Sequence, residues 1–266
     1  MPGRAHRIVF ANEKGGTGKS TTAVHAAVAL VASGHRVGAL DLDTRQRTLA
    51  RYLDNRAATM RRRAVDLPQP DYLVLEDMSE AGLAAAVARL SENADYLVID
   101  TPGRDDPLGR AAISLADTLV TPINDSFVDL DLIGQVDAET FRVKRPSFYA
   151  ELIWELRKVR AKTDGGTVDW VILRNRLQHL EAHNMRRVAA ALAELSKRVG
   201  FRVIPGLGER VIYRELFPKG LTLLDVGAIE HVGLSHIAAR QELREMVAGF
   251  ALPGSEDIEP QRALSL

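Results

Sequence analysis

The chain has 266 residues, of which 46% are hydrophobic and 26% are charged, and this apolar content suffices for one substantial α/β core. Its 35 basic residues balance its 35 acidic residues, which excludes a protein that binds nucleic acid through overall positive charge. It has no cysteine, which excludes disulfides, thiolate metal sites and iron–sulfur clusters.

The first residues, 1–7, lead straight into an apolar segment without the apolar stretch of a signal peptide. No apolar run approaches the roughly 18 residues that a membrane-spanning helix needs. We therefore expect a cytoplasmic protein that does not enter a membrane.

Short apolar runs alternate with helical patterns almost to the end of the chain. The predicted strands are residues 8–12, 36–42, 72–75, 96–101, 118–123, 170–174 and 201–204. The predicted helices are residues 21–33, 44–53, 82–90, 147–162, 181–199 and 235–248. Runs such as 96–99 lack the polar alternation of a half-exposed strand, which is typical of a parallel sheet covered on both faces.

These elements predict an α/β fold with a doubly wound, mostly parallel sheet and helices on both faces. No internal repeat and no Pro/Gly/Ser-rich linker interrupts them. We predict a single domain over residues 1–250, followed by a polar, disordered tail over residues 251–266.

The most informative segment follows the first predicted strand, where residues 14–21 read Lys-Gly-Gly-Thr-Gly-Lys-Ser-Thr. Glycines in such a bend leave backbone N–H groups open to phosphate oxygens, and the helix that follows adds partial positive charge. Lys19 is placed to reach the outer phosphates and Ser20 to bind Mg²⁺. The predicted nucleotide site is Lys14, Gly15, Gly16, Thr17, Gly18, Lys19, Ser20 and Thr21.

Two further motifs lie at predicted strand ends, where ligands of a doubly wound sheet bind. Asp41 and Asp43 follow the second strand, and Asp100 ends the strand at 96–101, before Pro102 and Gly103. In P-loop enzymes such a strand-end acid holds the Mg²⁺ shell, a role that fits Asp100. Each aspartate alone could be a helix cap, and this alternative is favoured for Asp41. Together and in this order, they indicate a nucleotide site.

A strict P-loop has glycine where this chain has Glu13, and the extra lysine is Lys14. The segment 14–20 resembles the deviant Walker A motif of the ParA/MinD ATPases. The resemblance implies that two copies sandwich two nucleotides, with Lys14 reaching the partner's phosphates, and that Lys14, Lys19 and Asp43 are catalytic, Asp43 orienting water. It also implies that Asn175 lies near the adenine, although asparagine is a common turn residue.

Within this family the chain resembles most the MipZ branch, which positions the division site. The segments that carry the resemblance are 12–14, 41–48, 124–129, 170–176 and 210–218, whereas 66–94 resembles it least. The resemblance implies an ATP-dependent homodimer that binds ParB and non-specific DNA, inhibits FtsZ polymerisation and associates with the nucleoid. ATP and Mg²⁺ are the implied cofactors.

Basic residues cluster in two segments, 45–63 and 186–219. Local basic surfaces on a neutral protein suit salt-sensitive contact with DNA phosphates, although they could also be solvated helix faces. Arginine suits this contact because its planar fork pairs with phosphate at two points. The predicted DNA-binding residues are Arg187, Arg198, Arg202, Arg210 and Arg214.

Three other classes of ATP-dependent protein share parts of this pattern. A membrane-cycling MinD-like protein needs a basic amphipathic carboxyl-terminal helix, but residues 253–259 are acidic and begin with Pro and Gly. A ParA-type partition ATPase of chromosomes or plasmids shares the P-loop features. An ATP-dependent ligase on the same fold would bind its substrate where the partner copy is expected.

Overall fold

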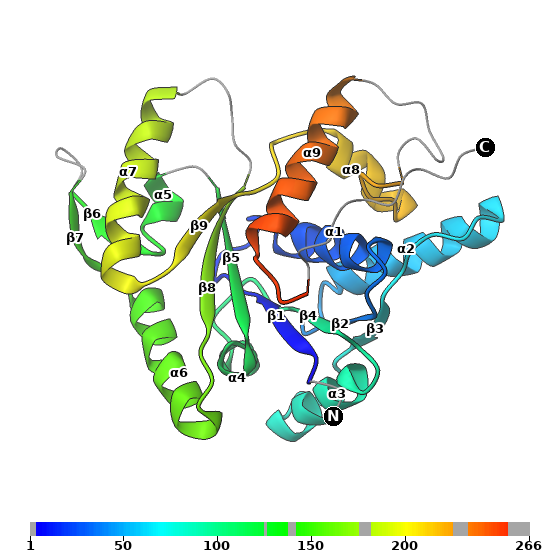
Figure 1. Ribbon diagram of the computed structural model, residues 1–266, viewed down its shortest axis with the longest axis horizontal. Helices are drawn as coiled ribbons and strands as arrows, with labels where there is room; N and C mark the ends of the chain where they lie inside the picture. Colours follow the sequence, from blue (N-terminus) through cyan, green and yellow to red (C-terminus); the bar gives the residue numbers. More distant parts are fainter. Residues whose placement is uncertain (1–3, 125–126, 138–141, 176–181, 226–233, 255–266) are drawn as a thin grey trace.

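The computed structural model of the chain describes residues 4–124, 127–137, 142–175, 182–225 and 234–254. A central twisted sheet carries helices on both of its faces (Figure 1). The short hairpin of β6 (Gly134–Val136) and β7 (Val143–Pro146) lies at one side of this sheet, next to α7 (Ala182–Val199).

All seven strands of the central sheet are parallel, in the spatial order β3-β2-β4-β1-β5-β8-β9. The chain starts in the middle and winds outward in both directions, which is the doubly wound arrangement. The predicted fold class is therefore confirmed. The strands are β1 His6–Phe10, β2 Val37–Asp41, β3 Asp71–Val74, β4 Tyr96–Asp100, β5 Thr118–Asn124, β8 Asp169–Asn175 and β9 Arg202–Pro205.

Two apolar cores lie on the two faces of the sheet. One face is covered by α1 (Lys19–Ala32), α2 (Thr48–Arg63), α8 (Ile212–Leu216) with the 3-10 turn η1 (Phe217–Lys219), and α9 (Leu234–Gly249). The other is covered by α3 (Glu80–Ser91), α4 (Pro107–Leu115), α6 (Phe148–Asp164) and α7, and the short α5 (Phe127–Leu130) packs against β5 and α7.

The strands explain this layering, because successive side chains point to opposite faces. In β1, Ile8 and Phe10 belong to the core beneath α1, whereas Val9 belongs to the core beneath α4, and all three are fully buried. A strand that buries both faces needs a continuous apolar run, which is the pattern seen in the sequence.

The predicted strands all occur, with bounds that differ by at most two residues. The largest error concerns the helix predicted at 44–53, since α2 begins at Thr48 and continues to Arg63. The Asp43 carboxylate accepts the backbone N–H groups of Arg45 and Gln46, which holds the preceding residues in a turn. Arg47 then adopts a left-handed φ of 49° before the helix starts.

Four described elements were not predicted: α4, the β6–β7 hairpin, α5 and α8 with η1. The start of α4 follows a recognisable signal, because Asp106 accepts the N–H of Leu108 as an N-cap and Pro107 occupies the first turn. The hairpin strands have three and four residues, which is too short for a periodic pattern to show.

The first residues of the predicted tail pack against the body of the protein. Leu252 is buried, and the Pro253 carbonyl accepts a hydrogen bond of 2.6 Å from the Tyr96 hydroxyl. Residues 255–266 lie outside the described residues, and the single domain over 1–250 stays a prediction. Among the described residues, none of the helices has the length and apolarity that crossing a membrane requires.

Candidate functional site

The P-loop lies at the carboxyl end of the sheet, between β1 and α1. Gly16 and Gly18 have φ values of 78° and 89°, which side chains with a Cβ rarely adopt. A Cβ on Gly18 would also lie 2.4 Å from the Asn175 amide nitrogen. These glycines are needed for the shape of the loop, which exposes backbone N–H groups at the start of α1.

The acid behind the loop is Asp100, the last residue of β4. It is fully buried, and burial raises its pKa to about 7, assisted by nearby Asp41 and opposed by the Ser20 hydroxyl and Lys19. Among the described residues, its Oδ1 atom has no hydrogen-bond partner, and neither has the buried hydroxyl of Thr17. Buried polar atoms without partners are costly, so these atoms mark a place for a ligand.

These residues fit a magnesium nucleotide. Mg²⁺ prefers oxygen ligands and is usually held by few protein groups together with phosphates. The Ser20 hydroxyl lies within hydrogen-bond reach of Asp100, so both oxygens could serve one ion. Lys19 is 7% exposed and donates to the Lys14 carbonyl at 2.9 Å. Burial lowers the pKa of Lys19, while Asp100 and Asp43 raise it.

The two aspartates after β2 have different surroundings. Both Asp41 carboxylate oxygens accept backbone N–H groups, from Asp43 at 2.9 Å and from Ala50 at 3.0 Å. Asp41 therefore has the structural role expected for it, at the start of α2. Asp43 is half-buried, and only its Oδ1 atom has hydrogen-bond partners among the described residues. Its other oxygen is available to orient a water molecule.

Lys14 lies on the outer side of the loop. Its Nζ atom is 3.0 Å from Oδ1 of Asp129, which is 6% exposed and also accepts the N–H of Asn124 at 2.8 Å. Asn12 anchors the same turn by accepting the Lys14 N–H at 2.7 Å. In this conformation Lys14 thus pairs with an acid of its own chain.

A hollow of about 340 Å³ adjoins the start of α1. Asn175 spans its inner end, donating to the Thr17 carbonyl at 2.9 Å and accepting the Leu207 N–H at 2.9 Å. Its wall is the segment from Gly208 to Phe217. Asn175 thus lines the same hollow as Gly18 and Thr21 of the P-loop, and its place near the adenine stays a prediction.

Three residues of this site were not among the predicted site residues. Asp129 holds Lys14, Tyr213 lines the hollow, and Gly103 comes so close to the loop that a Cβ there would lie 3.2 Å from Gly15 Cα and from Lys19 Nζ. Gly103 had a sequence signal as part of a Pro-Gly bend, and Asp129 and Tyr213 lie in segments 124–129 and 210–218, which carry the family resemblance without assigning them a role. Asp129 and Tyr213 are distant from the P-loop in sequence.

The five predicted DNA-binding arginines are not gathered in one cluster. Arg187 and Arg198 lie on α7, and Arg214 lies on α8, on the opposite face of the sheet. Arg198 pairs with Glu194, Arg202 with Asp169, and Arg210 with Glu242. The Arg202 guanidinium also donates to the carbonyls of Gly249 and Phe250.

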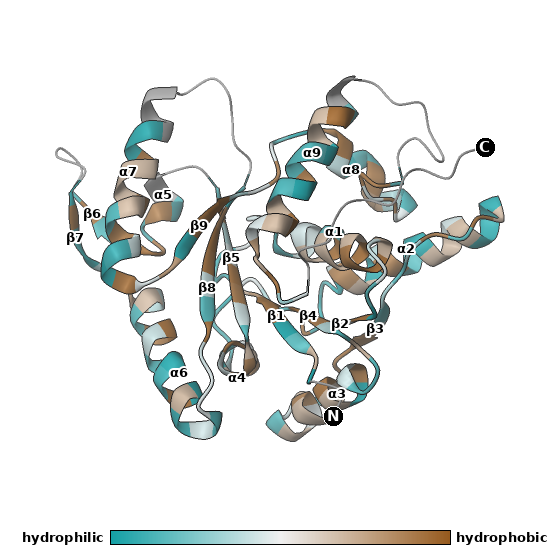
Figure 2. Ribbon diagram, in the orientation of Figure 1, coloured by the Kyte–Doolittle hydropathy of each residue, from teal (hydrophilic) through white to brown (hydrophobic). Residues whose placement is uncertain are grey.

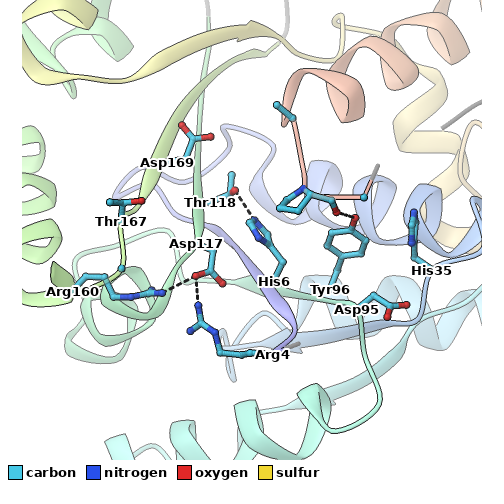
Figure 3. Close-up of a pocket in the computed structure, with 14 residues that line it drawn as sticks. Arg4, His6, His35, Asp95, Tyr96, Asp117, Thr118, Arg160, Thr167 and Asp169 are labelled. Atoms are coloured by element: carbon cyan, nitrogen blue, oxygen red, sulfur yellow. Dashed lines mark hydrogen bonds and ion pairs between the residues drawn. The ribbon is translucent and has the colours of Figure 1, made fainter. Parts of the chain in front are cut away.

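A second hollow, of about 740 Å³, lies at the opposite edge of the sheet, where the strands begin (Figure 3). His6 at the start of β1 bonds Thr118 at the start of β5, at 2.9 Å. Asp117 accepts from Arg4 and Arg160, as the dashed lines show. None of these groups is near the P-loop.

Comparison with known proteins agrees with this geometry. The family model described as ATPase MipZ matches residues 6–254. ParA from Rhizobium radiobacter is 28% identical over 128 residues, which are 48% of this chain and 53% of that protein. The chromosome-partitioning ATPase Soj from Thermus thermophilus is 30% identical over 145 residues, 48% of this chain and 58% of that protein. The chain thus spans about half the length of these curated relatives.

Solved structures share the fold. McdA from Cyanothece, solved with ATP, has a TM-score of 0.60 at 18% identity, covering 92% of this chain and 95% of that one. MinD from Pyrococcus horikoshii, solved with Mg-ADP, has a TM-score of 0.59 at 15% identity, covering 92% and 94%. The family model covers nearly the whole sequence, and on that match the chain belongs to the MipZ family of ATPases.

Proposed function

We propose that the chain is a slow ATPase that acts as a switch, dimerising around ATP and separating after hydrolysis. In this proposal it positions the division site by binding ParB and non-specific DNA and by inhibiting FtsZ polymerisation. The observation that carries the proposal is the open outer side of a P-loop that has a second lysine. Apart from the two chain neighbours, no atom of the described residues lies within 4 Å of where a Cβ on Gly15 would be. That surface has room for a partner copy.

The nucleotide is held by the residues already described. Lys19 and the loop N–H groups bind the phosphates, while Ser20 and Asp100 hold Mg²⁺, Asp100 through water. The hollow beside Asn175 takes the base. Mg²⁺ supplies charge stabilisation to the transferring phosphoryl group. The nucleotide complexes of McdA and MinD support this assignment.

Dimerisation follows from the electrostatics of a third phosphate. A cation given by a second subunit stabilises charge on the γ-phosphate only when ATP is bound, so ATP favours the dimer and hydrolysis releases it. Lys14 is the cation that this arrangement requires. For that role it must exchange its contact with Asp129 for the partner's nucleotide.

The cellular partners rest on membership of the MipZ family, and the names of the relatives support the same area of function. MinD is described as septum site-determining and Soj as chromosome-partitioning. Nucleoid association would follow from DNA binding. The described helices do not cross a membrane, and the proposal includes no membrane partner.

Co-sedimentation of FtsZ polymer with the protein and ATP tests this function, with Gly15→Val as the matched control. The valine places a branched side chain on the open surface of the loop, so this variant should bind ATP but stay monomeric. Loss of polymer with the wild type alone is the expected result. Undiminished polymer with both proteins would contradict the division role and favour a ParA-type partition ATPase.

A further inference from the structure

We propose that the outer surface of α2 is a contact surface for the phosphate backbone of double-stranded DNA. The inference rests on the DNA binding proposed above and names a surface for it that differs from the five predicted arginines. The surface, called here the α2 basic patch, consists of Arg45 and Arg47 in the turn before α2 and of Arg51, Arg61, Arg62 and Arg63 on the helix.

The patch is a local charge excess on a neutral molecule. All six arginines are exposed, and the one acid between residues 45 and 63 is Asp54. Six positive charges and one negative charge leave the exposed part of this segment with a net charge of +5 (6 − 1). The seventh arginine of the segment, Arg56, is buried against Asp225 and adds nothing to the surface.

The patch differs from the predicted arginines in its pairing. Among the described residues, no ion pair involves Arg45, Arg47, Arg51, Arg61 or Arg62. These five guanidinium groups can therefore bind phosphate without first leaving a carboxylate. Arg198, Arg202 and Arg210 would each have to give up an acid that already holds them.

The charges in the first part of the patch do not stabilise the helix dipole, although the Arg51 guanidinium lies 5.7 Å from the centre of the Phe217 ring. Arg45, Arg47 and Arg51 surround the amino-terminal end of α2, which carries partial positive charge and has no acid in its first turn. A cation there costs about 0.3 to 1 kcal/mol rather than contributing stability. Helix energetics accounts for Arg61, Arg62 and Arg63 at the other end, but not for these three.

The patch is presented on a rigid support. Arg56 makes two hydrogen bonds to Asp225, at 2.6 and 2.8 Å, and is 0% exposed. Thr59 donates to the Lys219 carbonyl at 2.7 Å, and Asn55 donates to the Phe217 carbonyl at 3.1 Å. These bonds fix the inner face of α2 to the segment beyond the nucleotide hollow, so its outer face keeps one orientation.

The composition of the surface favours DNA over a lipid bilayer or an acidic protein. A helix that binds a bilayer exposes bulky apolar residues, and a protein interface needs aromatic or aliphatic anchors. The large apolar side chains that are exposed in the described chain all lie outside α2. Figure 2 shows hydrophilic colouring at the outer end of this helix. Phosphate contacts need neither kind of anchor.

Salt-dependent binding to a random-sequence DNA duplex tests the inference, using the full chain with a non-hydrolysable ATP analogue. The test variant is Arg51→Gln, Arg61→Gln, Arg62→Gln. The control, with equal loss of charge, is Arg36→Gln, Arg89→Gln, Lys162→Gln, whose positions are exposed and outside α2. The test variant should bind DNA at least about tenfold more weakly at low salt, with a salt slope smaller by roughly 2 to 3, since each phosphate contact contributes about 0.9.

The outcomes separate the inference from the proposed function. Equal affinity and slope for the test variant and the wild type would overturn the α2 patch while leaving DNA binding intact. A wild type that does not bind DNA would overturn the DNA part of the proposed function, and the patch with it. Selective loss of binding to phosphatidylglycerol vesicles, with DNA binding unchanged, would assign the patch to lipid. Fluorescent-nucleotide affinity should be equal in all three proteins, which checks their fold.

Discussion

The two ends of the central sheet both carry clusters of charged residues, but their polar groups are partnered differently. The hollow at the amino-terminal edge is the larger, at about 740 Å³ against about 340 Å³ at the P-loop edge. Its polar groups bond to one another: His6 to Thr118, Asp117 to Arg160, and Tyr96 to the Pro253 carbonyl.

The P-loop edge is the opposite case, because it holds buried polar atoms with no partner within the described chain. Asp100 Oδ1 and the Thr17 hydroxyl lie there beside positive-φ glycines. Volume alone therefore does not identify the site, because a ligand could offset the cost of burying Asp100 and Thr17; at the other edge Arg7 Nε is also buried without a partner among the described residues.

The largest expected effect is at the P-loop edge. Lys19→Gln removes the buried ammonium that binds the outer phosphates and should weaken ATP binding roughly 1,000-fold, about 4 kcal/mol. Arg4→Gln removes an equal charge from the amino-terminal edge and should leave the affinity unchanged. A fluorescent-nucleotide titration of both variants checks this. Equal losses would show that the two edges do not differ in the way described.

The rate of ATP hydrolysis should likewise depend on the P-loop edge and not on the amino-terminal edge. Asp43→Ala removes the carboxylate oxygen available to orient water and should slow ATP turnover about 100-fold while ATP still binds. Asp95→Ala removes a partly exposed acid that pairs with Arg36 at the other edge, and its turnover should match the wild type. Phosphate release assays measure both, and wild-type turnover by Asp43→Ala would refute the role given to this residue.

The free energy of unfolding should depend more on the amino-terminal edge, the reverse of ATP binding and hydrolysis. Asp117→Ala leaves Arg160, which is 4% exposed, without one of its carboxylates and should cost about 2 kcal/mol of unfolding free energy. The variant should bind ATP with wild-type affinity. Urea unfolding measures the expected loss of stability, and the nucleotide titration measures the expected unchanged ATP affinity. A loss of ATP binding in folded Asp117→Ala protein would make the amino-terminal edge functional.

The smallest effect concerns the pH dependence of stability. Burial lowers the pKa of His25 from 6.5 to about 4, because its ring is enclosed beneath Tyr52 and Tyr213. The unfolded chain therefore takes up this proton first as pH falls, and stability is lost between about pH 6.5 and 4. From pH 7 to 5 the loss should be about 1 to 2 kcal/mol. Measured by urea unfolding, His25→Phe should lose less unfolding free energy than the wild type over that range. An unchanged loss would assign the pH dependence to other groups. One such group is half-buried His6, because burial also lowers its pKa.

Most of the fold was predictable because a doubly wound sheet leaves a strong pattern. Tyr96–Asp100 is buried at every position, so its apolar run predicts a central strand from local sequence alone. The start of α2 was not predictable, since it depends on the Asp43 carboxylate holding a turn and on Arg47 adopting a positive φ. Such local hydrogen bonds compete with helix formation at residues whose composition suits either state.

The site was predictable where one continuous segment forms it, as in residues 14–21. The contact between Lys14 and Asp129 joins residues 115 positions apart, and nothing in local pattern reveals it. The same limit applies to the predicted DNA arginines. The acid that pairs with Arg202 is Asp169, 33 positions earlier, so pairing that changes an arginine's availability becomes visible only in three dimensions.

The central claim is that ATP is enclosed between two copies, each of which gives Lys14 to its neighbour's nucleotide. Light scattering of Asp43→Ala protein saturated with ATP tests this most directly, alongside the same protein with ADP and a double variant that adds Lys14→Gln. The account predicts a doubled molar mass for Asp43→Ala with ATP alone, and single copies in the other two samples. Single copies with ATP at saturation, or dimers that persist without Lys14, would contradict it.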